Sequence, residues 1–269
     1  MVRHPSVAGM FYPGDRTGLE NDIKKYIDSA ESGQKKDVTG LISPHAGYIY
    51  SGSCAGKGFA AVNIPDKVVI LGVNHRGAGY SMAIDGNDIW ETPLGNIKID
   101  EQLRNSLVEV SDVFEIDSLP SEEEHSLEVQ VPFIQYLNPD ASILPITIAS
   151  MNIENMKKGG EELASMIKNR DEKILMIAST DMSHYVSSAL AEEKDSKAIR
   201  EIIDLEPERL IKTVVEEKIS MCGVSPTFIL MVAAKKLGAT AGEIIEYTNS
   251  GYTSGDFDQV VGYLSAVVY

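Results

Sequence analysis

Short apolar runs rich in β-forming residues alternate with longer amphipathic stretches along the whole of this 269-residue chain. Lys67–Val73 (KVVILGV) and Lys173–Ser179 (KILMIAS) are apolar almost throughout, which is typical of strands buried on both faces of a parallel sheet. Gly18–Ser29 instead places its apolar residues on one helical face. This alternation predicts an α/β fold, in which a mostly parallel sheet is sandwiched between helices.

The same reading predicts the remaining elements and one large domain over residues 1–269, with two small domains as the alternative. The expected linkers are short, such as Ser32-Gly33-Gln34 and Leu119-Pro120-Ser121. Further strands are expected at Val38–Ser43, Ser81–Asp88, Gly95–Ile99, Ser142–Ile148, Glu243–Thr248 and Val260–Val268. Further helices are expected at Cys54–Val62, Asp100–Val110, Ser126–Tyr136, Ile153–Lys168, Ala189–Asp204, Pro207–Glu217 and Ser225–Leu237.

Composition narrows the classes of function. The formal net charge is −16 and no basic stripe is visible, so nucleic acid and anionic membranes are poor partners. Two cysteines do not make a disulfide framework, which indicates a reducing, cytoplasmic location. We find no signal peptide and no apolar run of about 18 residues that would predict a transmembrane helix.

Histidines follow three of the predicted strands. His45 follows the strand Val38–Ser43, His75 follows Lys67–Val73, and His184 follows Lys173–Ser179. Ligands of open α/β sheets bind beyond the carboxyl ends of the strands. We therefore expect these three imidazoles to converge on one site.

Two neighbouring sequences add chemistry to that site. In STDMSHY, Asp181 and His184 are three residues apart, which is one turn if a helix begins there. The carboxylate would then orient the imidazole and raise its basicity. Cys222 precedes a predicted helix, and a helix N-terminus lowers the pKa of a thiol and so favours the thiolate.

Imidazoles and a thiolate favour iron, copper or zinc over magnesium or calcium. Ligation by His45, His75 and Cys222 would leave coordination positions open, as a catalytic site requires. His184 would then be free to act as an acid or base beside the metal.

Each of these residues also has a structural interpretation. The histidines could make ordinary turn hydrogen bonds, and Cys222 could be a small core residue. We interpret Cys54 as a core residue and His4 as incidental. His125 follows the acidic run Glu122–Glu124, which resembles a solvated helix start with a capping box; alternatively, His125 points into the pocket. The segment Asn249–Phe257 is interpreted as a functional loop or a surface turn.

Collinear motifs over nearly the whole chain resemble the Memo family of mediators of cell motility, whose prokaryotic members are also described as protein B of the AmmeMemoRadiSam system. The motifs are PHAGYIYSG, LGVNHRG, TPLGNIKID, EEHSLEVQVPF, STDMSHY, the CG pair at Cys222, and NSGYTSGDFDQVVGY. The family is in turn similar to the LigB-type class III extradiol dioxygenases, which are non-haem iron enzymes. The resemblance implies a three-layer αβα sandwich around a central sheet.

The resemblance also implies roles for individual residues. His45, His75 and Cys222 match the metal ligands of the family, and Asp181 and His184 match pocket residues, with His184 at the position of the dioxygenase acid/base histidine. The dioxygenases complete a triad of two histidines and a carboxylate. A thiolate in the third position shifts the preference towards copper and is itself oxidisable.

Three functions remain open on the sequence. The first is an iron or copper redox protein, an oxidoreductase in which His184 moves protons, Asp181 orients it and His125 lies in the pocket. The second is a non-catalytic module that binds a small molecule, a peptide or a partner protein in the pocket, working with radical-SAM and AMMECR-type proteins. The third, ranked last, is a zinc hydrolase with an activated water.

Overall fold

A computed structural model describes residues 1–30 and 33–269; Ser32 of the expected linker lies outside this range. The described strands form one mixed sheet of 12 strands, in the order β1-β5-β6-β8-β3-β9-β2-β12-β10. Strand β11 pairs with β12, β4 pairs with β8, and β7 pairs with β4. The bounds are β1 Val2–Arg3, β2 Gly40–Ser43, β3 Lys67–Val73, β4 Met82–Ile84, β5 Ile89–Thr92, β6 Gly95–Ile99, β7 Glu115–Ile116, β8 Ser142–Ile148, β9 Ile174–Ser179, β10 Asp181–Val186, β11 Gly242–Asn249 and β12 Val260–Val268.

The centre of the sheet is parallel, because β8, β3, β9 and β2 all run in the same direction. Strand β12 is antiparallel to its neighbours β2, β10 and β11. The apolar runs that predicted buried strands are β3 and β9, and the six residues of β9 are all buried. These central strands carry the loops that form the candidate site.

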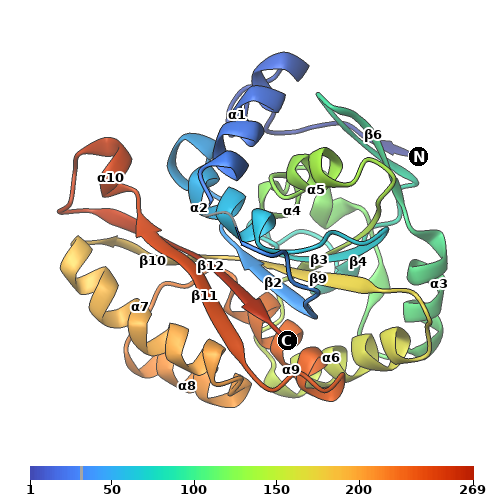
Figure 1. Cartoon of the computed structure of the whole chain (residues 1–269). Helices are drawn as coiled ribbons and strands as arrows, with labels where there is room; N and C mark the ends of the chain where they lie inside the picture. The colour runs from blue at the N-terminus through green and yellow to red at the C-terminus, as the bar shows by residue number, and fades with distance from the viewer. Residues whose placement is uncertain (31–32) are drawn as a thin grey trace.

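Helices cover both faces of the sheet (Figure 1). Helices α1, α2, α4 and α5 pack on one face, and α3, α6, α7, α8 and α9 pack on the other. Alternate residues of β3 divide between the two cores, since Val68 and Ile70 face the first group while Val69 and Leu71 face the second. The predicted three-layer αβα sandwich is therefore confirmed.

The described helices begin and end close to the predicted bounds, with local reasons for the differences. Gly47 is the N-cap of α2, so that helix begins six residues earlier than predicted. Pro132 lies in the first turn of α5 and separates it from α4, which splits the helix predicted over Ser126–Tyr136. The bounds are α1 Arg16–Asp28, α2 Tyr48–Ala60, α3 Glu101–Val110, α4 His125–Glu128, α5 Val131–Leu137, α6 Ile153–Lys168, α7 Ser188–Ile203, α8 Pro207–Glu216, α9 Val224–Lys236 and α10 Gly251–Ser254, with a 3-10 turn at Leu119–Ser121.

The condition for a helical turn at STDMSHY is not met. Asp181 and His184 lie on strand β10, not on a helical turn. The strand pairs with β12 through an irregular register, with shifts on both sides of His184. Sheet pairing outweighs the local helical spacing here, because β12 offers a long neighbouring strand.

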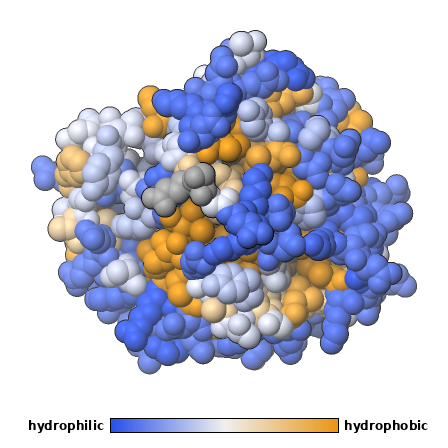
Figure 2. Space-filling view, in the orientation of Figure 1, coloured by the Kyte–Doolittle hydropathy of each residue, from blue (hydrophilic) through white to orange (hydrophobic). Residues whose placement is uncertain are grey.

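The surface is largely hydrophilic at its margins, and apolar side chains gather near the middle of the face shown in Figure 2. No helix in the described part of the chain has the length and apolar character that crossing a membrane requires.

Candidate metal centre

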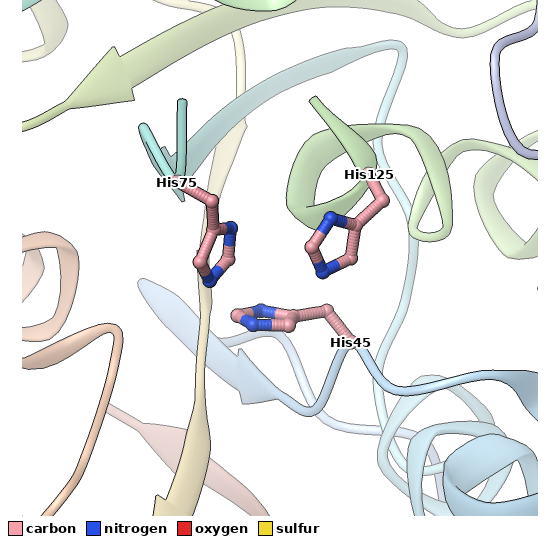
Figure 3. A group of neighbouring side chains, drawn as sticks. All are labelled: His45, His75 and His125. Carbon is pink, nitrogen blue, oxygen red and sulfur yellow. The ribbon is translucent and has the colours of Figure 1, made fainter. Parts of the chain in front are cut away.

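Three histidines meet at one end of the sheet, two of them beyond the carboxyl ends of the parallel strands β2 and β3, between which β9 lies. His45 comes two residues after β2, His75 two residues after β3, and His125 begins α4. One ring nitrogen from each lies within 4.8 Å of those of the other two. Figure 3 shows the three rings turned towards a common point.

Hydrogen bonds fix the tautomer of His45. Its Nδ1 lies 3.0 Å from Ser179 Oγ, and that hydroxyl donates its only hydrogen to the Ser126 carbonyl at 2.6 Å. The hydroxyl must therefore accept from Nδ1, which leaves the lone pair on Nε2. The His45 backbone nitrogen donates to Asp181 Oδ1 at 2.8 Å. His45 is thus held, almost fully buried, with Nε2 free to bind a metal.

Glu124 fixes His75 in the same way. The carboxylate is buried and accepts from the His75 backbone nitrogen at 2.8 Å and from Nδ1 at 2.9 Å. Burial by itself would raise the pKa of Glu124, but the hydrogen bonds from His75, first that of its side chain, and from the Ser126 backbone outweigh it and lower the pKa. The carboxylate therefore stays charged and leaves His75 Nε2 free.

His125 completes the group of imidazoles. Its ring stacks on that of His75, with 4.6 Å between centroids, and packs against Phe11 at 4.7 Å. Burial lowers the pKa of His125, although the Glu124 charge opposes it. Burial and the neighbouring imidazoles also lower the pKa of His45. Both rings are therefore neutral at pH 7, the form that binds metals.

Cys222 lies next to His45 instead of within the histidine group. Its Sγ is 3.2 Å from His45 Nε2, so both atoms are within reach of a single ion at ordinary bond lengths of about 2.0–2.3 Å. Gly223 allows this placement, because a Cβ there would lie 2.4 Å from the Ser179 carbonyl oxygen. The three imidazoles form the histidine set, whose ligand atoms all lie within 4.8 Å of one another. The expected set of His45, His75 and Cys222 shares two of these residues, and Cys222 approaches the histidine set at His45.

The expected thiolate is not what the surroundings of Cys222 favour. Burial, followed by the charge of Asp181, raises the pKa of the Cys222 thiol to about 12. Helix α9 does begin two residues later, but the loss of water contact outweighs its N-terminus. Without a metal, Cys222 is a neutral thiol at pH 7.

Asp181 and His184 lie beside the centre. Asp181 Oδ1 accepts from the His45 backbone, and burial raises the pKa of this carboxyl to about 6. His184 Nδ1 pairs with the Met182 carbonyl at 2.7 Å, and its backbone nitrogen donates to Ser220 Oγ. The recorded partner of His184 Nδ1 is therefore a carbonyl oxygen, where we expected the Asp181 carboxylate.

A cavity of about 510 Å³ opens beside these residues. His125, Asp181 and His184 line it together. Part of Asn249–Phe257, a segment predicted to be a functional loop or a surface turn, also contributes to the wall.

Two residues interpreted as unrelated to the site are His4 and Cys54. His4 is exposed and pairs with Glu91. Cys54 is buried against Ser265, as its core interpretation predicts.

The main residue that the sequence reasoning missed is Glu124. The acidic run was interpreted as a solvated helix start capped from Ser121, but Glu124 is buried and is itself the N-cap of α4. Glu122 and Glu123 do face solvent. In the sequence, Glu124 stands directly before His125, and this position is the feature that marks it. The position does not reveal that Glu124 contacts His75 in the loop after β3.

The fold and the site define a three-layer α/β protein with a candidate metal centre of histidine and cysteine side chains at the carboxyl ends of its parallel strands. The chain belongs to the Memo-like protein family, whose model matches residues 3–267. This confirms the resemblance seen in the motifs.

Relatives support the assignment over their full lengths. The chain is 36% identical to a MEMO1 family protein of Methanosarcina barkeri, covering 99% of this chain and all of the relative. It is 40% identical to one of Aquifex aeolicus, covering 99% of this chain and 98% of the relative. The crystal structure of an uncharacterized protein from Escherichia coli K12 shares the fold, with a TM-score of 0.52, 14% identity and coverage of 84% and 99% of the two chains.

Proposed function

We propose that this protein binds one redox-active metal ion, iron or copper, through His45, His75 and Cys222, and that it is a non-haem oxidoreductase. The observation that carries the proposal is the fixed orientation of the two imidazoles. Both Nδ1 atoms are engaged by Ser179 and Glu124, so both Nε2 atoms are left as ligands. Such outer hydrogen bonds are typical of metal-binding histidines.

Cys222 is our choice for the third ligand because its Sγ already lies 3.2 Å from His45 Nε2. Soft sulfur with two imidazoles suits copper or iron, and zinc ranks behind them. Three protein ligands leave open positions for a substrate. When bound, the ion would supply one-electron chemistry and activation of dioxygen.

The chain's own residues have distinct roles in this proposal. Asp181 holds the backbone of His45 in place. Nδ1 of His184 donates a hydrogen bond to the Met182 carbonyl oxygen, which leaves the lone pair on Nε2. Nε2 is therefore the atom that accepts a proton from a bound molecule. His125 lies on the cavity wall and orients a ligand there.

A non-catalytic binding module is the second candidate. Two exposed side chains with large apolar surfaces, Tyr50 and Tyr185, line the cavity. Such groups are typical of surfaces that receive a peptide or another protein. A radical-SAM or AMMECR-type protein would be the partner, in the cytoplasm. A zinc hydrolase ranks last, because Asp181, the expected general base, is engaged by the His45 backbone.

Metal analysis of protein purified without oxygen tests the proposal. We expect near-stoichiometric iron or copper in the wild type, and its loss in His45→Ala and Cys222→Ser. His4→Ala is the matched control, because His4 is exposed, pairs with Glu91 and is not among the cavity-lining residues. Metal-free protein that also fails to take up Fe(II), Cu(I) or Zn(II) would leave the binding module as the function.

A further inference from the structure

The charges on the cavity wall are unbalanced. The wall contains the carboxylates of Asp181 and Asp256, and none of its described residues is lysine or arginine. A carboxylate or phosphate group entering the cavity would therefore find no fixed cation from the wall to pair with. The wall favours ligands that are neutral or positively charged.

Asp256 is the carboxylate available at the mouth. It is exposed, and its recorded hydrogen bonds, from the backbone nitrogens of Asp258 and Gln259, both end on Oδ1. These bonds hold the carboxylate in place while Oδ2 remains free to accept. A fixed carboxylate with a free oxygen is the usual partner of an ammonium or guanidinium group.

Aromatic residues line the same cavity as this carboxylate. Phe11, Tyr50, Tyr185 and Tyr263 all line the same cavity. Cations bind favourably over the faces of such rings. The combination of carboxylates, aromatic rings and no basic side chain is what a site for an organic cation requires.

Tyr185 has a backbone that supports a role in binding. Its φ is 56°, in the left-handed region that side chains other than glycine rarely adopt, and its side chain is 75% exposed. It also lies between His184 and Val186, where the pairing of β10 with β12 shifts register. Irregular strand pairing changes the direction in which a side chain points. Residues in rarely populated backbone conformations often occur at ligand sites.

We propose that the cavity recognises a ligand that carries an alkylammonium or guanidinium group on an apolar or aromatic body, with the positive charge bound between Asp256 and the rings of Tyr50 and Tyr185. This inference rests on the proposed function in one respect, since the body of the ligand would then extend towards the metal centre. The cationic group could belong to a small amine or to the end of a peptide.

Three ring-matched probes test the charge preference by calorimetric titration at pH 7. Phenethylamine is a cation, 2-phenylethanol is neutral and 3-phenylpropionate is an anion, and none of them chelates a metal. We expect the amine to bind most tightly, by about fivefold over the alcohol, and the acid to bind least. Equal affinities, a preference for the acid, or no binding of the amine at millimolar concentration would overturn the proposal.

Variants locate the charge. Asp256→Asn should lower the affinity for phenethylamine to that of the alcohol, whereas Asp258→Asn, a neighbouring exposed residue outside the cavity wall, should leave it unchanged. An equal loss of phenethylamine affinity in both variants would show that the overall negative charge of the protein attracts the amine. That result would overturn the assignment to Asp256. Tyr185→Leu should also weaken the amine more than the alcohol, and the opposite order would count against the ring.

Two further experiments distinguish a peptide from a small amine as the ligand, and this inference from the proposed metal-binding function. The tripeptide Phe-Gly-Gly and its Nα-acetylated form compare a peptide amine with phenethylamine; tighter binding of the free-amine peptide points to a polypeptide, and tighter binding of phenethylamine to a small amine. All titrations are repeated on metal-free protein, with metal content measured separately. Cation binding without metal uptake would contradict only the proposed function, and metal uptake without cation preference would contradict only this inference.

Discussion

The Glu124 carboxylate accepts two hydrogen bonds from His75, one from the backbone nitrogen at 2.8 Å and one from Nδ1 at 2.9 Å. One carboxylate therefore determines both where this residue lies and which of its ring nitrogens faces the other imidazoles. The same carboxylate accepts from the Ser126 backbone nitrogen at 2.8 Å, at the start of the helix that carries His125. Two of the three histidines thus depend on a single buried side chain.

Glu124→Gln should weaken metal binding by about 10–100-fold, as the loss of an outer hydrogen-bonding partner usually does. The glutamine amide has only one acceptor oxygen, so one of the two donors of His75 would face an NH₂ group. A competition titration with a chelator and Zn(II) or Co(II) measures the change. Glu123→Gln is the control, because Glu123 is exposed and pairs with the exposed Arg76. Equal affinities for the two variants would contradict the role of Glu124.

The pH dependence of metal affinity should distinguish the two ligand sets. Burial raises the pKa of Cys222 to about 12, so ligation by this thiol must release a proton at neutral pH. The apparent affinity should then rise about tenfold for each pH unit between pH 7 and 8. Burial lowers the pKa values of His45 and His125, so these imidazoles release no proton in that range.

Cys222→Ser is the decisive comparison for that dependence. If the thiolate is a ligand, the variant should bind metal more weakly and lose most of the rise with pH. A wild-type affinity that is flat above pH 7 would instead favour the set of three histidines, since neutral imidazoles bind without releasing protons. The two outcomes separate cleanly because the two sets differ only in that ligand.

The parts of the site that follow strands could be predicted from the sequence. The sequence predicts the parallel strands β2, β3 and β9, whose carboxyl ends lie together, so His45, His75 and His184 were expected to meet. His45 and His75 do meet, but the third imidazole of the group is His125 and not His184. Only the alternation of apolar and amphipathic segments was needed for this step, because it depends on local pattern.

The parts that depend on distant contacts could not be predicted. Glu124 is 49 residues from His75, and no periodicity in either segment reveals that they touch. The strand β10 pairs with β12, and the local spacing of Asp181 and His184, which would suit one turn of a helix, does not reveal this partner. The pKa of Cys222 depends on its burial, which only the packed structure shows.

Gly72→Ala should disturb the candidate metal centre through α4, the helix that carries His125. A Cβ at this position of β3 would lie 2.6 Å from Ser126 Oγ and 2.7 Å from the Leu127 side chain, both on α4. The helix must move away from the strand, which should cost about 1–3 kcal/mol and displace His125. Chemical denaturation and metal titration measure the two effects. Unchanged stability with unchanged affinity would mean that α4 tolerates the displacement.

Glu128 holds the N-terminal segment that places Phe11 against His125. Its carboxylate forms a buried ion pair with Arg3 at 2.6 Å and accepts from the Tyr12 hydroxyl at 2.6 Å. Burial alone would raise the pKa of Glu128, but the charge of Arg3 and the hydrogen bonds, first that of Tyr12, lower it below 4.5. A carboxyl whose folded pKa is depressed contributes stability above its unfolded pKa, and the contribution is lost as the pH falls through the folded value.

Glu128→Gln should therefore lower the free energy of unfolding by about 3–5 kcal/mol at pH 7, because the charge of Arg3 remains buried without the carboxylate that balances it. The difference between variant and wild type should shrink below pH 4.5, where protonation begins to remove the same charge from the wild type. Urea denaturation at pH 7 and pH 4 measures both quantities. Glu20→Gln, which removes one partner of an exposed pair with Arg16, should leave the midpoint unchanged. A Glu128→Gln midpoint equal to that of this control at pH 7 would show that the ion pair does not stabilise the N-terminal segment.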